Sequence, residues 1–176
     1  MSAQRPNDFT VSPVEEADIG PLTALAREIW YQHYPGIITV KQIEYMLDQR
    51  YSPEVIREQI GSADVWWDKL VVEGDLGGFA CYELADGPDA MKLDKLYIHQ
   101  VFRGRGLGGA LIEHVERASR ARGCSSLFLQ VNRNNSASIT VYRRKGFAIA
   151  KTVKVDIGGG FFMDDYVMVK DARRKA

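Results

Sequence analysis

A glycine-dense loop separates an apolar segment from an amphipathic one in the stretch YIHQVFRGRGLGGALIEHVERA, which runs from Tyr97 to Ala118. Leu107, Leu111 and Val115 recur after the glycines at the spacing of one helical face. A helix N-terminus directs several N–H groups at one point, and glycines allow a ligand to approach the backbone closely. The stretch therefore predicts an anion site between a strand and a helix, the latter from Gly106 to Arg122.

The remaining sequence supplies strand and helix patterns around this loop. A capping position at Asp18, a capping-box spacing at Thr39 and Gln42, and Ser52 before a proline predict three early helices. A turn at residues 73–75 predicts a hairpin over 65–84. Further strands are expected at 9–14, 91–99, 125–131, 147–157 and 164–170, with a helix at 135–144. This order predicts an α/β (α+β) fold with a single mixed, mostly antiparallel central sheet of six to seven strands, flanked by four to five helices.

Composition narrows the functional classes. Lys plus Arg and Asp plus Glu both number 23 in 176 residues, so the formal net charge is zero. This balance argues against a general nucleic-acid binder or a polybasic membrane anchor. The first ten residues show no apolar signal core, and no apolar run reaches membrane-spanning length, so a cytoplasmic protein with no membrane partner is expected.

Cysteines and histidines give no metal or disulfide pattern. Cys81 and Cys124 are far apart and form no CxxC pair. His33, His99 and His114 do not have metal-ligand spacing such as HExxH. No metal is expected.

Three kinds of phosphate loop compete for the glycines. Gly104-x-Gly106-x-x-Gly109 has dinucleotide spacing, but the next strand ends in LQVN at Asn132, without the carboxylate that holds the ribose. A nucleoside-triphosphate loop requires Gly-Lys-Ser/Thr, which the residues after Gly108 do not supply. The third interpretation uses Arg103-x-x-Gly106-x-Gly108 as a pyrophosphate site on a helix N-terminus.

A second motif, N-x-x-S-x-x-V-Y-R-R-K-G-F, begins at Asn135 and contains Tyr142. With the loop motif before it, the chain resembles the GCN5-related N-acetyltransferase (GNAT) superfamily over roughly residues 64–170. The segment YPGIITVKQIEYMLDQRYSPEVIREQI also resembles the PaiA-like polyamine acetyltransferase branch. The resemblance implies one N-acetyltransferase domain over 1–176, with acceptor-side helices at 14–62 and an acetyl-CoA-binding core at 64–170.

The resemblance also implies the residues that bind acetyl-CoA, the acyl-donor co-substrate. The main chain of the strand before the loop is expected to pair with pantetheine and to polarise the thioester carbonyl. Asn135 is expected to bond the pantetheine arm or to cap a helix. The implied set comprises Leu96, Tyr97, Ile98, Arg103, Gly104, Arg105, Gly106, Leu107, Gly108, Gly109 and Asn135.

Two residues are expected to take part in catalysis. By resemblance, Tyr142 lies near the thioester sulfur and donates a proton to the leaving thiolate. Asp94 is two residues before Leu96, so a regular strand turns both to the same face, and Asp94 is the candidate base or substrate anchor. The alternative for Asp94 is a solvent-facing carboxylate paired with Lys92 or Lys95. Other acidic groups that could meet a cationic substrate are Glu28, Asp64 and Asp68.

These features predict an N-acetyltransferase that moves an acetyl group to a primary amine by direct attack, with a polyamine-like small molecule favoured. An acetyltransferase for protein or peptide N-terminal amines, a non-catalytic acyl-CoA sensor and an NAD-dependent enzyme are the alternatives. A monomer or homodimer is expected. Five aromatic residues of the early helices are expected to be core or to enclose an amine by cation–π contact: Trp30, Tyr31, Tyr34, Tyr45 and Tyr51.

Overall fold

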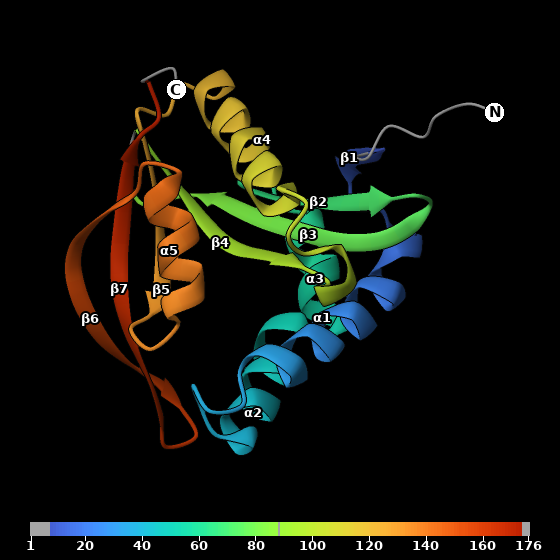
Figure 1. The fold of residues 1–176 in the computed structure, drawn as a ribbon, viewed down its shortest axis with the longest axis vertical. Helices are drawn as coiled ribbons and strands as arrows, with labels where there is room; N and C mark the ends of the chain where they lie inside the picture. The colour runs from blue at the N-terminus through green and yellow to red at the C-terminus, as the bar shows by residue number, and fades with distance from the viewer. Residues whose placement is uncertain (1–7, 88, 174–176) are drawn as a thin grey trace.

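The computed structural model of the protein describes residues 8–87 and 89–173. Its centre is one seven-stranded sheet with the strand order β1-β2-β3-β4-β5-β7-β6 (Figure 1). Neighbouring strands are antiparallel except β4 and β5, which are parallel. The strands are β1 Phe9–Pro13, β2 Val65–Val72, β3 Asp75–Leu84, β4 Ala90–Ile98, β5 Ser126–Asn132, β6 Ala148–Gly158 and β7 Phe161–Asp171.

Helices cover both faces of this sheet. The α-helices are α1 Ile19–His33, α2 Val40–Tyr51, α3 Pro53–Ile60, α4 Leu107–Ala121 and α5 Ser136–Arg144, with short 3-10 turns at Glu16–Asp18 and Gln100–Phe102. One buried cluster joins α4 and α5 to the sheet, and a second joins α1, α2 and α3 to the opposite face of β2, β3 and β4. The predicted α/β fold, its mixed sheet and its helix number are confirmed.

Most of the expected helix starts are present. The Thr39 and Ser52 side chains accept hydrogen bonds from the backbone N–H groups three residues later. The capping box at Thr39 is only half formed, because the Gln42 amide donates to the Phe162 carbonyl instead. Asp18 precedes α1, but its carboxylate accepts from the Glu15 N–H and from Lys69, so it does not cap α1 as expected.

The sheet opens between β4 and β5. Their parallel pairing runs from Ala90 and Ser126 only as far as Leu93 and Leu129. Beyond that point β4 continues to Ile98 on β3, and β5 continues to Asn132 on β7. The last five of the nine residues of β4 therefore have a neighbouring strand on one side only. The opening lies beside the N-terminus of α4 and beside α5 (Figure 1).

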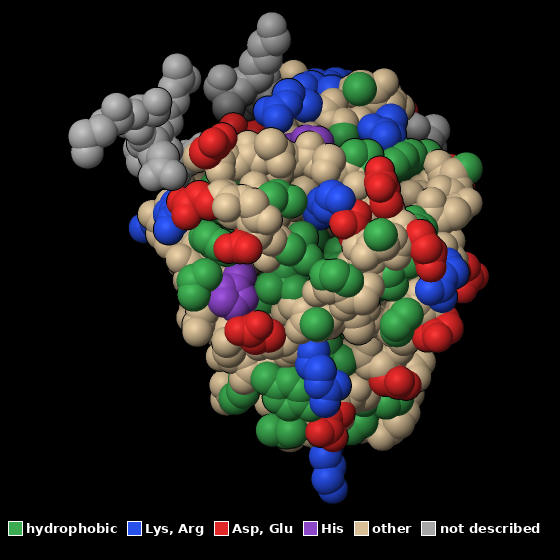
Figure 2. Space-filling view, turned by 90° about the vertical axis from the view of Figure 1, so that its right-hand side faces the viewer, with side chains coloured by type: hydrophobic (Ala, Val, Ile, Leu, Met, Phe, Trp, Pro, Cys, Tyr) green, Lys and Arg blue, Asp and Glu red, His purple; other side chains and the backbone are tan. Residues whose placement is uncertain are grey.

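The surface and the hydropathy pattern agree with the composition. Charged side chains of both signs are interspersed over the face drawn in Figure 2, with no single-sign field on that face. Across the part of the chain that the structure describes, every helix is too short or too polar to cross a membrane. The predicted compartment rests largely on residues 1–7, which are outside the described residues, and it stays a prediction.

Candidate functional site

A cavity of about 430 Å³ occupies the opening between β4, α4 and α5. We call it the glycine-loop cavity. Nine of the eleven residues predicted to bind the acyl donor line it, and so does Tyr142: Leu96, Tyr97, Ile98, Arg103, Gly104, Gly106, Leu107, Gly108 and Gly109. The two sequence motifs, which are separated by a helix and a strand, therefore meet in one cavity.

The loop presents free backbone donors to this cavity. Gly104 and Gly106 have φ of +78° and +75°, a conformation that side chains with a Cβ rarely adopt. The Ala110 N–H donates to the Gly106 carbonyl at 3.0 Å and closes the first turn of α4. The N–H groups of the three residues before Ala110 have no acceptor within the helix. A pyrophosphate group fits these donors and the positive end of the helix dipole.

The open edge of β4 adds further backbone groups. The His99 N–H donates to Gly77 of β3, and successive residues of a strand turn their polar backbone groups to alternate sides. Leu96 and Ile98 therefore direct theirs away from β3, into the opening. The Arg103 Nε donates to the Ile98 carbonyl at 3.1 Å, which fixes the loop against the end of the strand.

Two predicted residues lie outside the glycine-loop cavity. Arg105 forms an ion pair with Glu73 at 2.8 Å, packs over the Phe102 ring and does not line the cavity, so its expected part in binding the acyl donor stays a prediction. Asn135 is buried and caps α5 by accepting from the Ser138 N–H, and it also bonds the His33 imidazole at 3.1 Å. The helix cap is therefore observed, and the expected bond to the pantetheine arm, which does not exclude it, stays a prediction.

Tyr142 lies at the inner end of the glycine-loop cavity. Its ring packs edge-on against Phe147, and burial raises the pKa of its phenol to about 12. Such a phenol keeps its proton at neutral pH. The Tyr142 side chain also lines a smaller cavity of about 60 Å³, which we call the neck.

The neck leads to a third cavity of about 420 Å³, the ion-pair cavity, between β4, β5, α2 and the β6–β7 hairpin. Leu96, Tyr97, Ser138 and Tyr142 are common to the glycine-loop cavity and the neck. Met46, Arg50, Asp94 and Gln130 are among the residues common to the neck and the ion-pair cavity. Two compartments of similar size thus meet near the Tyr142 side chain.

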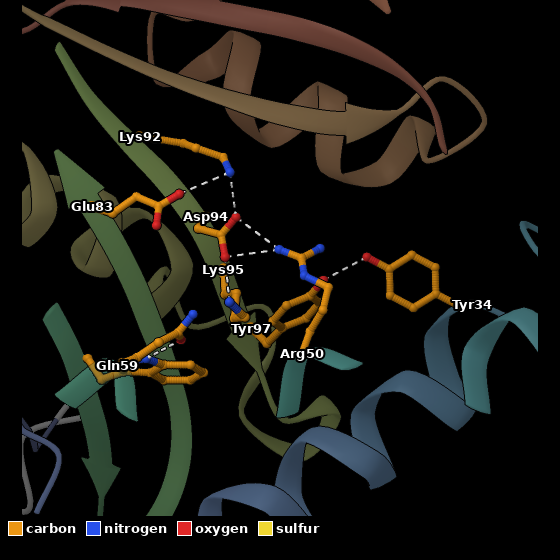
Figure 3. A network of polar contacts seen from close by, with 9 residues as sticks. Tyr34, Arg50, Gln59, Glu83, Lys92, Asp94, Lys95 and Tyr97 are labelled. Carbon is orange, nitrogen blue, oxygen red and sulfur yellow. Dashed lines mark hydrogen bonds and ion pairs between the residues drawn. The ribbon is translucent and has the colours of Figure 1, made fainter. Parts of the chain in front are cut away.

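Asp94 is the centre of a charged network in the ion-pair cavity (Figure 3). One Nη atom of Arg50 lies 2.9 Å from both of its oxygens, Lys92 lies at 2.9 Å, and Lys95 is a third contact. Burial opposes ionisation of Asp94, but these cations outweigh it and hold the pKa of the carboxyl well below its usual range. A carboxylate that binds protons so weakly is a poor general base.

A β-bulge explains why the side chain of Asp94 does not follow the alternation of a regular strand. Lys95 pairs with Cys81 and Leu93 pairs with Tyr82, so Asp94 is an extra residue without a partner on β3. Asp94 contacts Arg50 on the α2 side of the sheet, whereas Leu96 packs into the cluster under α4. The prediction that Asp94 and Leu96 share a face is wrong. The alternative is right in pairing Asp94 with Lys92 and Lys95 but wrong in facing it to solvent, because its side chain is only 9% exposed.

The three other acidic residues that were expected to meet a cationic substrate lie outside the neck and the ion-pair cavity. Glu28 bonds His99 at 2.8 Å, and Asp64 is exposed before β2. Asp68 is buried under α4, where its carboxylate accepts from Tyr82 and contacts His114, each at 2.7 Å. None of the three lines the neck or the ion-pair cavity.

The sequence did not indicate three charged residues of the ion-pair cavity, Arg50, Glu83 and Asp165. Asp165 is 3% exposed, and its Oδ1 accepts no hydrogen bond from any described residue. Burial, and to a lesser degree Asp164, raises the pKa of this carboxyl to about 6, although Arg50 opposes the shift. The only sequence signal is that Asp165 lies two residues from Met163 and from Val167, on the same face of the strand.

Among the early aromatic residues, Trp30 and Tyr51 are core, as expected of most of them. Tyr34 lines the neck, where its hydroxyl lies 2.8 Å from that of Tyr97 (Figure 3). Tyr45 lines the ion-pair cavity and donates to the Ile157 carbonyl. Within residues 8–87 and 89–173, no group of three His, Cys, Asp or Glu side chains could hold a metal ion.

Comparison with known proteins fits this architecture. The model of the Acetyltransferase (GNAT) family matches residues 26–147, which is more than half of the chain. The chain belongs to the GNAT family of acetyltransferases. The sequence-based assignment is confirmed, and the glycine-loop cavity is the part of this GNAT fold that both predicted motifs line.

The relatives with assigned activities share about a quarter to a third of their aligned residues with this chain. The chain is 27% identical over 139 residues to a spermidine N(1)-acetyltransferase of Thermoplasma acidophilum, covering 77% of this chain and 85% of that protein. It is 33% identical over 112 residues to a spermine/spermidine N(1)-acetyltransferase of Bacillus subtilis, covering 58% and 67%. The crystal structure of PaiA N-acetyltransferase from T. acidophilum in complex with coenzyme A superposes with a TM-score of 0.80 at 23% identity, over 93% of this chain and 99% of that one. This last match shows a common fold.

Proposed function

We propose that this GNAT protein transfers an acetyl group from acetyl-CoA to the primary amine of a polyamine-like small molecule. The observation that carries the proposal is the junction of two compartments at Tyr142, one lined by the glycine loop and the other by charged residues. Relatives that act on spermidine and spermine support the choice of acceptor.

In this proposal the glycine-loop cavity holds the acyl donor. The N–H groups of Leu107, Gly108 and Gly109 bind the pyrophosphate, and Arg103 adds a positive charge at the rim. The backbone groups of Leu96 and Ile98 in the open edge of β4 pair with the pantetheine arm. When bound, acetyl-CoA supplies the activated thioester; the chain supplies its orientation and the donors around it.

Tyr142 is proposed as the acid that protonates the departing thiolate. Its raised pKa keeps the phenol protonated, and its position between the cavities directs it toward the reacting centre. Asp94 is proposed as the anion that holds Arg50 and Lys95 in place and not as the base, because the surrounding cations stabilise its charged form.

The test is an acetyl-CoA turnover assay with spermidine, spermine, putrescine, L-lysine and a peptide with a free N-terminus. Acetylation of a polyamine is expected, and acetylation of the peptide alone would favour a protein N-terminal acceptor. A thermal-shift comparison of coenzyme A with NAD runs in parallel, because a ligand that binds only the folded state raises stability. Coenzyme A protection without turnover of any amine would indicate an acyl-CoA sensor, and protection by NAD alone would refute the proposal.

A further inference from the structure

One carboxylate of the ion-pair cavity takes no part in the Asp94 network. Asp165 lies on β7, is almost fully buried, and forms no ion pair with any described residue. Its Oδ1 has no hydrogen-bond donor among the described residues. A buried carboxylate without a partner is costly, and the cost is offset when a ligand supplies the missing donor.

The charges of the cavity show what that ligand must carry. Glu83 is paired with Lys92, and Asp94 is paired with Lys92, Lys95 and Arg50. Asp165 is thus the one carboxylate lining the cavity, among the described residues, that is free to accept from a ligand. The cavity offers one buried place for a cationic or amine group and not several.

We propose that Asp165 receives the acceptor amine, anchoring its ammonium group and taking the proton that the nitrogen must lose before it attacks. This inference rests on the proposed acetyl transfer. It assigns to β7 the role that the strand pattern had suggested for Asp94 on β4.

The proton balance of the step is complete with residues of this chain and water. The Asp165 carboxylate takes one proton from the ammonium group, and the freed nitrogen lone pair forms a C–N bond with the acetyl carbonyl. As the C–S bond breaks, its electron pair leaves with sulfur, which takes the phenolic proton of Tyr142. The amide nitrogen loses its surplus proton, which restores the Tyr142 phenol through water, and Asp165 releases its own proton to solvent.

The environment of Asp165 suits this exchange. Burial raises the pKa of its carboxyl to about 6, which leaves it ionised at neutral pH yet able to hold a proton. The charged groups that face the cavity from the surrounding elements are Arg50 on α2, Glu83 on β3, and Lys92, Asp94 and Lys95 on β4. Asp164 adds a negative charge from β7 itself. The Tyr45 hydroxyl already donates to the Ile157 carbonyl.

The experiment compares Asp165→Asn with Asp164→Asn, which makes the same chemical change one residue away. Asp164 is half exposed and paired with Arg133 at 3.4 Å. Steady-state rates are measured from about pH 5 to about pH 9, with acetyl-CoA and the amine that the wild type acetylates fastest in the panel above. We expect Asp165→Asn to lower kcat/KM for the amine by about 100-fold or more and to abolish the acidic limb near pH 6.

Two further measurements separate a chemical role from a structural one. Coenzyme A affinity should be unchanged in Asp165→Asn, and Asp165→Glu should recover part of kcat with a displaced acidic limb. Asp164→Asn should stay within about threefold of the wild type. Where Asp165→Asn does not fold, Asp165→Ser provides the same comparison.

An Asp165→Asn enzyme that keeps both its kcat/KM for the amine and the acidic limb would overturn this inference while leaving acetyl transfer intact. Failure of the proposed function has a different signature, because the wild type itself would then acetylate no amine. The two failures are therefore distinguishable in one set of assays.

Discussion

Replacement of Asp165 by Asn should stabilise the protein at neutral pH even as it removes activity. Folding raises the pKa of this carboxyl from 3.8 to about 6, so the native state favours its protonated form. The resulting stability is fully present below about pH 4 and is lost as pH rises to about 6. Above that range the buried charge costs about 3 kcal/mol, because each pKa unit corresponds to about 1.4 kcal/mol.

The Asn side chain removes this charge but adds an amide with donors to satisfy. That mismatch costs about 1 kcal/mol at every pH, so the net gain in unfolding free energy should be about 2 kcal/mol near pH 8. Near pH 4.5 most of the gain should be gone. The change of the mutant-minus-wild-type difference with pH is therefore the diagnostic quantity, because the amide cost cancels from it.

The assay is urea unfolding followed by far-ultraviolet circular dichroism at about pH 4.5 and about pH 8. Asp164→Asn is the matched control, and its difference from wild type should vary by less than about 0.5 kcal/mol, because its ion pair is largely exposed. If the unfolding free energies of Asp165→Asn and wild type differ by the same amount at both pH values, the carboxylate of Asp165 has a partner in the native state. The reasoning about its raised pKa would then be refuted.

Three other substitutions test the rest of the site. Tyr142→Phe should lower kcat, measured by acetyl-CoA turnover, by about 100-fold, with little change in the coenzyme A dissociation constant measured by calorimetry. Equal turnover of the variant and the wild type would exclude the acid role. Gly106→Ala should weaken coenzyme A binding by about tenfold, because a Cβ at φ of +75° costs about 1–2 kcal/mol of backbone strain, whereas Gly20→Ala, in an open position of α1, should not. Asp94→Asn should lower the unfolding free energy by about 3 kcal/mol, since it leaves the buried Lys95 without its anion, and a loss no larger than that of Asp164→Asn would contradict this.

Most of the residues that line the glycine-loop cavity could be predicted from the sequence because their signals are local. Glycines 104 and 106 need positive φ, the next residues begin an amphipathic helix, and Asn135 caps the helix that carries Tyr142. Each of these features depends on a few neighbouring residues. Their meeting in one cavity follows from the order of one strand, one helix and the next strand, which the pattern also predicts.

The ion-pair cavity could not be predicted in the same way. Arg50 is 44 residues from Asp94, and it reaches the carboxylate only because α2 packs under the opened sheet. The bulge at Asp94 arises from pairing with β3 and leaves no mark in the alternation of apolar residues. Asp165 is an inward carboxylate on a late strand, and nothing local indicates that it shares a cavity with helix α2. These contacts are tertiary, so single-strand periodicity misassigns them.

The opening of the sheet gives Asp94 and Asp165 opposite chemistry although both line one cavity. Asp94 sits at a bulge where two lysines and an arginine converge, so its charge is permanent and serves to position those cations. Asp165 lies across the opening on β7 without such partners, and burial brings its pKa near neutrality. On the far side of the neck, burial moves the pKa of Tyr142 to about 12. A group suited to accept a proton thus lines the ion-pair cavity, and a group that retains one lines the neck beside it, which is the separation of acid and base that the proposed amine acetylation requires.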